Sequence, residues 1–82
     1  MSQIYTLEYP INVNGEVVSE IKLRRPTVKD MKNTEKQGGG DFEQAIALIA
    51  SLSGISQQDI ENIDGADFKK INNLVVDKFF RH

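Results

Sequence analysis

The segment from residue 23 to residue 53 most constrains the fold, because it places a strand end, a helix start and a helix break close together. Leu23-Arg24-Arg25-Pro26 ends an apolar strand pattern, and Thr27 follows as an N-cap whose side chain can accept the amide of Asp30. The glycines at 38–40 then end the helix that begins after Thr27. The sequence therefore predicts two helices, over about residues 28–37 and 41–53, that follow a strand.

Apolar and polar residues alternate on both sides of Asn14-Gly15, which predicts an N-terminal β-hairpin over about residues 4–25. Asn-Gly is a strong signal for a hairpin turn. The apolar side chains that we expect on the inner face of the first strand are Tyr5, Leu7, Tyr9, Ile11 and Val13, and those of the second are Val17, Ile21 and Leu23.

The register of this hairpin depends on the length of its loop. A strict two-residue loop sets Leu7 against Lys22, whereas one additional residue sets Leu7 against Leu23 and Val13 against Val17. We therefore expect a three-residue loop or a bulge near Val18. Pro10 cannot donate to a ladder, so it marks an edge position or a break in the first strand.

The second half of the chain reads as helical. We expect Asp41 to cap the helix over 41–53, whose inner face carries apolar residues at a 3.6-residue period: Phe42, Ala45, Ile46, Ile49 and Leu52. Two hydrophobic staples, at 55–60 and 63–68, predict two further helices over about 57–63 and 65–80. The last helix is expected to bury Phe68, Ile71, Leu74 and Val75, with Phe79 as a further candidate. At the start of this last helix, we interpret Asp64 as the N-cap and Asp67 as a residue exposed to solvent.

These patterns predict a small α+β protein: a hairpin followed by about four α-helices, forming a single domain over residues 1–82. A chain of this length buries only about 60–65% of the surface that its unfolded form exposes. The sequence has no cysteine, so disulfides and thiolate ligands cannot supplement the core. Its stability must rest on packing alone.

The sequence offers no catalytic, cofactor-binding or metal-binding site. His82 is the only histidine, and no serine has a base near it by local spacing. The three glycines lack the phosphate-binding pattern GxxxxGK[ST], so we interpret them as a helix end and a hinge. An EF-hand alignment centred on Gly65 puts Ile60 and Ile71 where carboxylates are required. The sequence favours a protein that is not an enzyme.

Charge and hydropathy exclude two further classes of partner. The net charge of −2 and the pI of about 5.3 argue against a domain held on nucleic acid by phosphate contacts. No apolar run approaches the roughly 20 residues that cross a bilayer. Residues 1–5 do not resemble the start of a secretory signal peptide, so we expect the protein to stay in the cytoplasm.

Two features suggest a protein-binding surface. The cluster formed by Lys22, Arg24, Arg25, Lys29 and Lys32 is either a solvated strand edge and helix face or a contact for an acidic protein. Phe79 and Phe80 are adjacent, so only one can point fully into the core, and the other is frayed or contacts a second chain. The candidate partner-binding residues are therefore Arg24, Arg25, Phe79 and Phe80.

The order of these features resembles the tail assembly chaperones of Mu-like and P2-like contractile-tailed phages and prophages, the tail protein E class. The resemblance rests on Asn14-Gly15, residues 23–27, the run from Glu35 to Glu43 around the glycines, the helix from Ala45 to Gly54 and the helix start from Asp64 to Phe68. It covers nearly the whole chain.

The resemblance implies a non-enzymatic protein of the host bacterial cytoplasm that is absent from the mature virion. Such proteins coat the long tape measure protein during tail morphogenesis and recruit tail tube subunits. A frameshifted longer form often shares their N-terminal domain, which implies that this chain is the short form. The sequence leaves two alternatives undecided. The protein forms a homo-oligomer or it does not, and its function is that of a chaperone or that of a small phage-encoded adaptor or inhibitor of a host protein.

Overall fold

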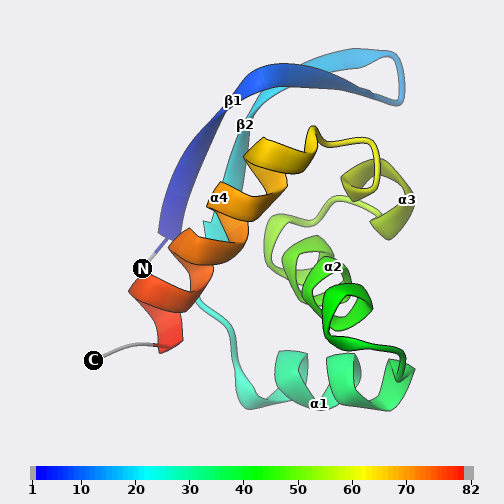
Figure 1. Ribbon diagram of the computed structural model, residues 1–82, viewed down its shortest axis with the longest axis vertical. Helices are drawn as coiled ribbons and strands as arrows, with labels where there is room; N and C mark the ends of the chain where they lie inside the picture. The colour runs from blue at the N-terminus through cyan, green and yellow to red at the C-terminus, as the bar shows by residue number, and fades with distance from the viewer. Residues whose placement is uncertain (1, 81–82) are drawn as a thin grey trace.

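A computed structural model describes residues 2–80 and shows a long hairpin beside four helices (Figure 1). Strands β1 (Ser2–Val13) and β2 (Glu16–Arg24) form an antiparallel two-stranded sheet. Four helices follow: α1 (Val28–Gln37), α2 (Asp41–Ser53), α3 (Gln57–Ile60) and α4 (Gly65–Val75), the last of which continues as a π-helical turn, η1 (Val76–Phe80). The predicted α+β class, a hairpin followed by four helices, is confirmed.

The core lies between the concave face of the hairpin and helices α2 to α4. In Figure 1 the hairpin curves along α4 and arches over its start, while α1 lies at the opposite end of the molecule. Both strands and all three helices contribute buried apolar side chains, among them Leu7, Ile21, Leu23, Ile49, Ile60, Ile71 and Val75. Helix α1 differs, because Asp30 is its only buried residue.

The hairpin turn corrects the predicted register. Val13 pairs with Glu16, so the loop has two residues, Asn14 and Gly15, and both have positive φ (54° and 84°). A turn with two positive φ angles matches the right-handed twist of the strands, which is why Asn-Gly forms it without a third residue. The predicted three-residue loop is wrong, and so are the predicted pairs of Val13 with Val17 and Leu7 with Leu23.

A bulge near Val18, the predicted alternative, is present and restores the apolar face, with its additional residues in β1 opposite Ser19. Residues 7–10 lie between the paired residues Thr6 and Ile11, where β2 has only Ser19. This bulge changes the parity of the ladder, so that Tyr5 pairs with Ile21 and Gln3 with Leu23. Pro10, which has no N–H, lies in this break. Tyr9 and Val17, both expected to face inward, are 58% and 75% exposed.

Local capping signals fix most helix starts. Thr27, Ser56 and Asp64 are N-caps, and the side chain of each accepts a hydrogen bond from an amide in the first turn of its helix. Asp41 does not cap α2 as predicted, because Gly40 occupies the N-cap position and Asp41 is already the first helical residue.

Two helix ends differ from the predicted bounds. The helix expected over 57–63 ends at Ile60, because the amides of Asn62 and Ile63 bond to carbonyls only three residues earlier and close a turn. The helix expected over 65–80 is α-helical only to Val75, and η1 carries the chain on to Phe80.

Candidate interaction surfaces

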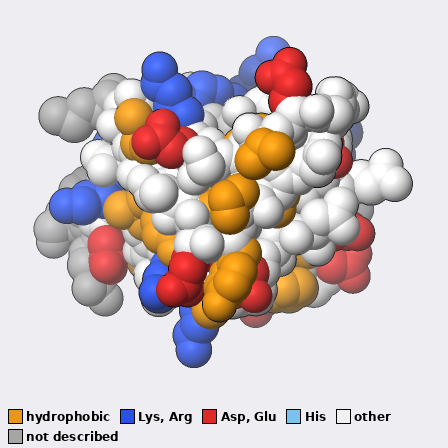
Figure 2. Space-filling view, turned by 90° about the horizontal axis from the view of Figure 1, so that it is seen from above, with side chains coloured by type: hydrophobic (Ala, Val, Ile, Leu, Met, Phe, Trp, Pro, Cys, Tyr) orange, Lys and Arg blue, Asp and Glu red, His pale blue; other side chains and the backbone are white. Residues whose placement is uncertain are grey.

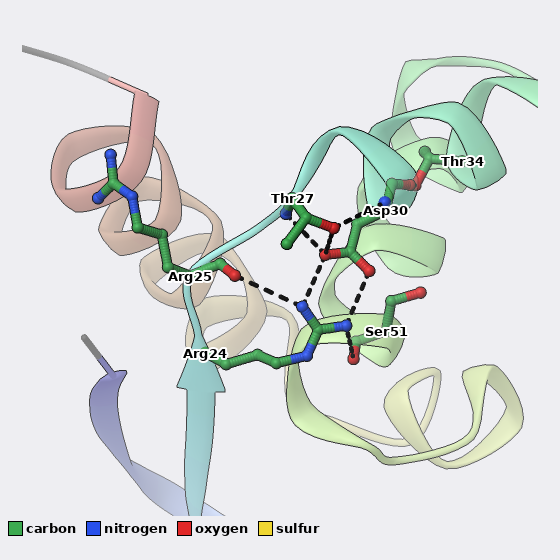
Figure 3. Close-up of polar contacts among 6 residues, drawn as sticks. All are labelled: Arg24, Arg25, Thr27, Asp30, Thr34 and Ser51. Atoms are coloured by element: carbon green, nitrogen blue, oxygen red, sulfur yellow. Dashed lines mark hydrogen bonds and ion pairs between the residues drawn. The ribbon is translucent and has the colours of Figure 1, made fainter.

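Arg24 connects the end of β2 to two helices (Figure 3). Its Nη1 and Nη2 atoms lie 2.6 and 2.7 Å from the two carboxylate oxygens of Asp30 in α1. The same Nη2 atom lies 3.3 Å from the carbonyl oxygen of Ser51 in α2. Paired contacts of a guanidinium with a carboxylate fix both distance and orientation. Arg24 therefore positions α1 and α2 against the hairpin, although half of its side chain stays exposed.

Asp30 is ionised at neutral pH despite its burial. The hydrogen bond from Arg24 holds the pKa of the Asp30 carboxyl well below its usual range, although burial acts in the opposite direction. The amide and hydroxyl of Thr27 also donate to this carboxylate, at 2.8 and 3.0 Å. The side chain that completes the capping box of α1 is thus also the partner of Arg24.

The other three predicted partner-binding residues lie around the C-terminal turn. Phe79 is buried, and the guanidinium carbon of Arg25 lies 5.9 Å from the centroid of its ring, within the range of a cation–π contact. Phe80 is 40% exposed. It lines a small hollow of about 230 Å³ together with Met31 and Leu48. Arg25 and Phe80 are thus open to solvent, whereas Phe79 is packed.

Asp67 holds the bulge of β1, a role that the sequence analysis missed. Its carboxylate accepts hydrogen bonds from the amides of Glu8 and Tyr9, at 3.1 and 3.0 Å, and from the hydroxyl of Tyr5 at 2.9 Å. Burial by itself raises the pKa of Asp67, but the two backbone amides and the Tyr5 hydroxyl outweigh it and lower the pKa. The interpretation of Asp67 as a solvated residue is wrong, because it is 1% exposed.

One signal in the sequence pointed to this role. Asp67 lies four residues before Ile71 and eight before Val75, so all three share one face of α4. A carboxylate on an apolar helix face needs donors from a neighbouring element. The bulge of β1 supplies them, since its amides have no partner in β2.

A groove opens between the start of α2 and the start of α4. It has a volume of about 630 Å³ and an apolar floor formed by Ala45, Ile46, Ile60, Ile63, Phe68 and the exposed Phe42. The rings of Phe42 and Phe68 meet edge to face, with centroids 5.4 Å apart. Phe42, expected in the core, is 68% exposed because its ring covers Phe68 from outside. We call this feature the Phe42 groove.

On the face at the hairpin end the exposed apolar side chains are dispersed. Figure 2, which looks down on the hairpin end, shows them in separate groups among polar side chains, with acidic and basic groups around the edge. Among residues 2–80 no three His, Cys, Asp or Glu side chains are placed to hold a metal ion. No helix in the same range is long and apolar enough to cross a membrane.

The Arg24–Asp30 ion pair and the buried carboxylate of Asp67 hold the scaffold, and an apolar groove and exposed aromatic residues remain at the surface. These features define a small α+β domain with an apolar groove on its surface. A family model described as phage tail assembly chaperone proteins, E, or 41 or 14, matches residues 4–80, so the chain belongs to the phage tail assembly chaperone family. Comparison with curated proteins and with solved structures gives no match.

Family membership confirms the resemblance drawn from the sequence. It indicates a role in phage tail assembly through contact with tail proteins and suggests a role that is not enzymatic. It also favours the chaperone over the rival function as an adaptor or inhibitor of a host protein.

Proposed function

We propose that this protein is a non-enzymatic chaperone that binds the tape measure protein and helps to recruit tail tube subunits during tail assembly. It acts in the host bacterial cytoplasm and is absent from the mature virion. A frameshifted longer form that shares this domain is a further expected partner. The observation that carries the proposal is the family match, which spans residues 4–80.

The hairpin offers one means of binding a long partner. Its sheet has two strands, so within the described chain each strand has an outer edge without a neighbouring strand. Unpaired edges accept an extended segment through main-chain hydrogen bonds. Ile4 and Val17, 56% and 75% exposed, add apolar contacts on these strands. Such an interface is modest and reversible, as a transient coat requires.

We place the partner surface at this strand edge and at Arg24, Arg25, Phe79 and Phe80. Arg25 and Phe80 make the direct contacts, because both are exposed. Arg24 and Phe79 act indirectly by positioning the contact residues. Arg24 forms an ion pair with Asp30, and the ring of Phe79 contacts the guanidinium of Arg25. An acidic and partly apolar segment of the partner matches the charge of Arg25 and the ring of Phe80.

Co-expression with the tape measure protein tests the proposal. We expect a soluble complex with several copies of this chain per tape measure chain, measured by size-exclusion chromatography with light scattering. A tape measure protein that stays insoluble while this chain elutes alone contradicts the coating role.

The variant Arg25→Glu/Phe80→Ser tests the surface. We expect it to fold and to lose most of its tape measure binding. Lys70→Glu is the matched control, because Lys70 is an exposed base on α4, away from the strand edges and from the proposed contact residues. Equal binding by the double variant and the control places the partner surface elsewhere. Arg24→Glu is less suitable, since it removes the contact with Asp30 and disturbs the position of α1.

A further inference from the structure

The hairpin turn places an asparagine where it can react with its own backbone. Asn14 is the only non-glycine residue among residues 2–80 with a positive φ, 54°, and Gly15 follows it. The side-chain carbonyl carbon of an asparagine and the backbone nitrogen of the next residue can close a five-membered ring. A side chain on that next residue obstructs the approach, and glycine has none.

The surroundings of the turn leave both reacting groups accessible. Asn14 and Gly15 are exposed, at the corner of the molecule where the hairpin turns back (Figure 1). Within the described chain no hydrogen bond engages the side chain of Asn14 or the amide of Gly15. A Cβ added at Gly15 would meet nothing within 4 Å. The attacking nitrogen and the carbonyl carbon therefore have no competing protein partner among residues 2–80.

The other asparagines of the described chain lack this combination. The residue after Asn12 is Val13, which is paired in the ladder. The residue after Asn62 is Ile63, whose amide donates to a carbonyl three residues earlier at 3.0 Å. Three more lie within helices α1 and α4: Asn33, Asn72 and Asn73. All five are followed by a residue with a side chain, so Asn14 alone precedes an unhindered amide.

The end of the hairpin also has the freedom that ring closure requires. The bulge of β1 separates three residue pairs at this end from the rest of the ladder. The last two pairs, Asn12 with Val17 and Val13 with Glu16, include no buried side chain. Segments with few buried contacts open locally at a low cost in free energy. The backbone of Asn14 can thus rotate while the core stays folded.

We propose that Asn14 is a site of spontaneous deamidation in the folded protein. The backbone nitrogen of Gly15 attacks the side-chain carbonyl carbon of Asn14 and forms a new C–N bond. The bond to the side-chain nitrogen breaks, and that nitrogen leaves as ammonia with the proton of the Gly15 amide. Water then adds to either carbonyl of the cyclic imide and opens the ring, which gives an aspartate or a β-aspartyl linkage. Water is the only co-reactant, and nothing is oxidised or reduced.

The β-aspartyl product changes the turn as well as the charge. Its main chain passes through the side-chain carbons, so the turn gains one backbone carbon. A two-residue turn with two positive φ angles fits the twist of its strands, and a longer one does not. The new carboxylate also lies next to that of Glu16, and like charges repel. The pair of Val13 with Glu16 therefore opens, and Val17 leaves the strand edge.

This inference goes beyond the proposed function, because the reaction needs no partner protein. Only its consequence for partner binding rests on the proposed function, since Val17 belongs to the strand edge placed in that surface. Deamidation is irreversible under these conditions, because the ammonia is lost to the solvent. The turn thus acts as a one-way chemical switch within the hairpin.

Peptide mapping by mass spectrometry tests the reaction. The wild type is kept in mildly alkaline buffer, both folded and unfolded in guanidinium chloride, and sampled over time. Deamidation raises the mass by one dalton, and fragment spectra assign it to a residue. In the folded chain we expect Asn14 to convert at least about tenfold faster than any other asparagine, and no more than about tenfold slower than in the unfolded chain, because the hairpin end opens easily.

Hydrogen exchange tests the consequence for the turn. The aged protein is separated by ion exchange, and its β-aspartyl form is compared with freshly prepared wild type and Asn14→Asp. Asn14→Asp is the matched control, because it has the new charge without the additional backbone carbon. We expect the amides of Val13 and Glu16 to lose protection in the β-aspartyl form and to keep it in Asn14→Asp.

Three results overturn the proposal. The first is an Asn14 that stays intact in the folded chain although it converts in guanidinium chloride, and the second is another asparagine that converts as fast. The third is a β-aspartyl form whose amides stay as protected as those of the wild type. All three are measured on the isolated chain, so they are distinguishable from a failure of tape measure binding.

Discussion

The two aromatic residues of the Phe42 groove allow a quantitative test of the structure. Phe68 is 8% exposed and Phe42 is 68% exposed, although their rings are in contact. Truncating a buried phenylalanine to alanine costs about 3–5 kcal/mol, and we expect this cost for Phe68→Ala. Phe42→Ala loses an edge-to-face contact worth about 0.5–1.5 kcal/mol and about a third of the burial of one ring, roughly 0.5–1 kcal/mol. We therefore expect Phe42→Ala to cost about 1–2.5 kcal/mol.

Urea unfolding followed by circular dichroism measures both costs. A domain of this size has a total free energy of unfolding of about 4–12 kcal/mol, so Phe68→Ala removes a large share of it. For a small protein with an m value of about 1 kcal/mol per M, Phe42→Ala lowers the midpoint by about 1–2.5 M. If Phe68→Ala is too unstable to measure, Phe68→Leu, a smaller change of volume, gives the comparison.

The double variant Phe42→Ala/Phe68→Ala isolates the contact between the rings. We expect a coupling free energy of about 0.5–1.5 kcal/mol. A cost for Phe42→Ala as large as that for Phe68→Ala refutes the reasoning, because Phe42 is then part of the core and leaves no open groove. A zero coupling energy refutes the edge-to-face contact itself.

Further predictions concern the two buried carboxylates and the glycines. Asp30 and Asp67 have pKa values below that of an ordinary aspartate, so the stability that they add is present above about pH 4 and is lost as pH falls through the lowered values. We expect the melting temperature of the wild type to fall as the pH is lowered from 7 to 2.5, and that of Asp30→Asn to fall less steeply. A wild-type melting temperature that does not change with pH contradicts this prediction. In Asp67→Asn the two bulge amides must exchange hydrogen faster than in the wild type, whereas unchanged rates show that the carboxylate does not hold them. Gly15 has a φ of 84°, so Gly15→Ala is expected to lower the free energy of unfolding by about 1–2 kcal/mol in urea. Gly65 lies in a helix with open space around it, so Gly65→Ala is expected to raise the free energy of unfolding by about 0.4–1 kcal/mol. A Gly15→Ala variant that is more stable than Gly65→Ala refutes both predictions.

The structural features that depend on residues close together in the chain were predicted correctly from the sequence. Thr27 and Asp64 cap helices through amides at most three residues away, so their roles were visible in short motifs. The fold class followed from the change of apolar period after Pro26. Arg24 was noticed as part of a basic cluster, but its pairing with Asp30 was not, because a separation of six residues across a turn belongs to no local pattern.

What the sequence did not predict depends on distant partners. The register of the hairpin was wrong because it is set by a bulge whose amides bond to Asp67, about sixty residues further along the chain. Phe42 fits the apolar period of α2 as well as Ile46 does, yet only Ile46 is buried. Periodicity identifies the face of a helix, whereas the neighbouring helices decide how far along that face the core extends.

The hydrogen bonds between Asp67 and the bulge of β1 affect the order in which the chain folds. The hairpin leaves the ribosome before the helices, and its Asn14-Gly15 turn can form at once. The amides of Glu8 and Tyr9 find their acceptor only after α4 has been synthesised. Until then the outer half of the hairpin can sample more than one register, because contacts so distant in sequence form late. The first strand of this protein therefore completes its native pairing only when the last third of the chain is in place.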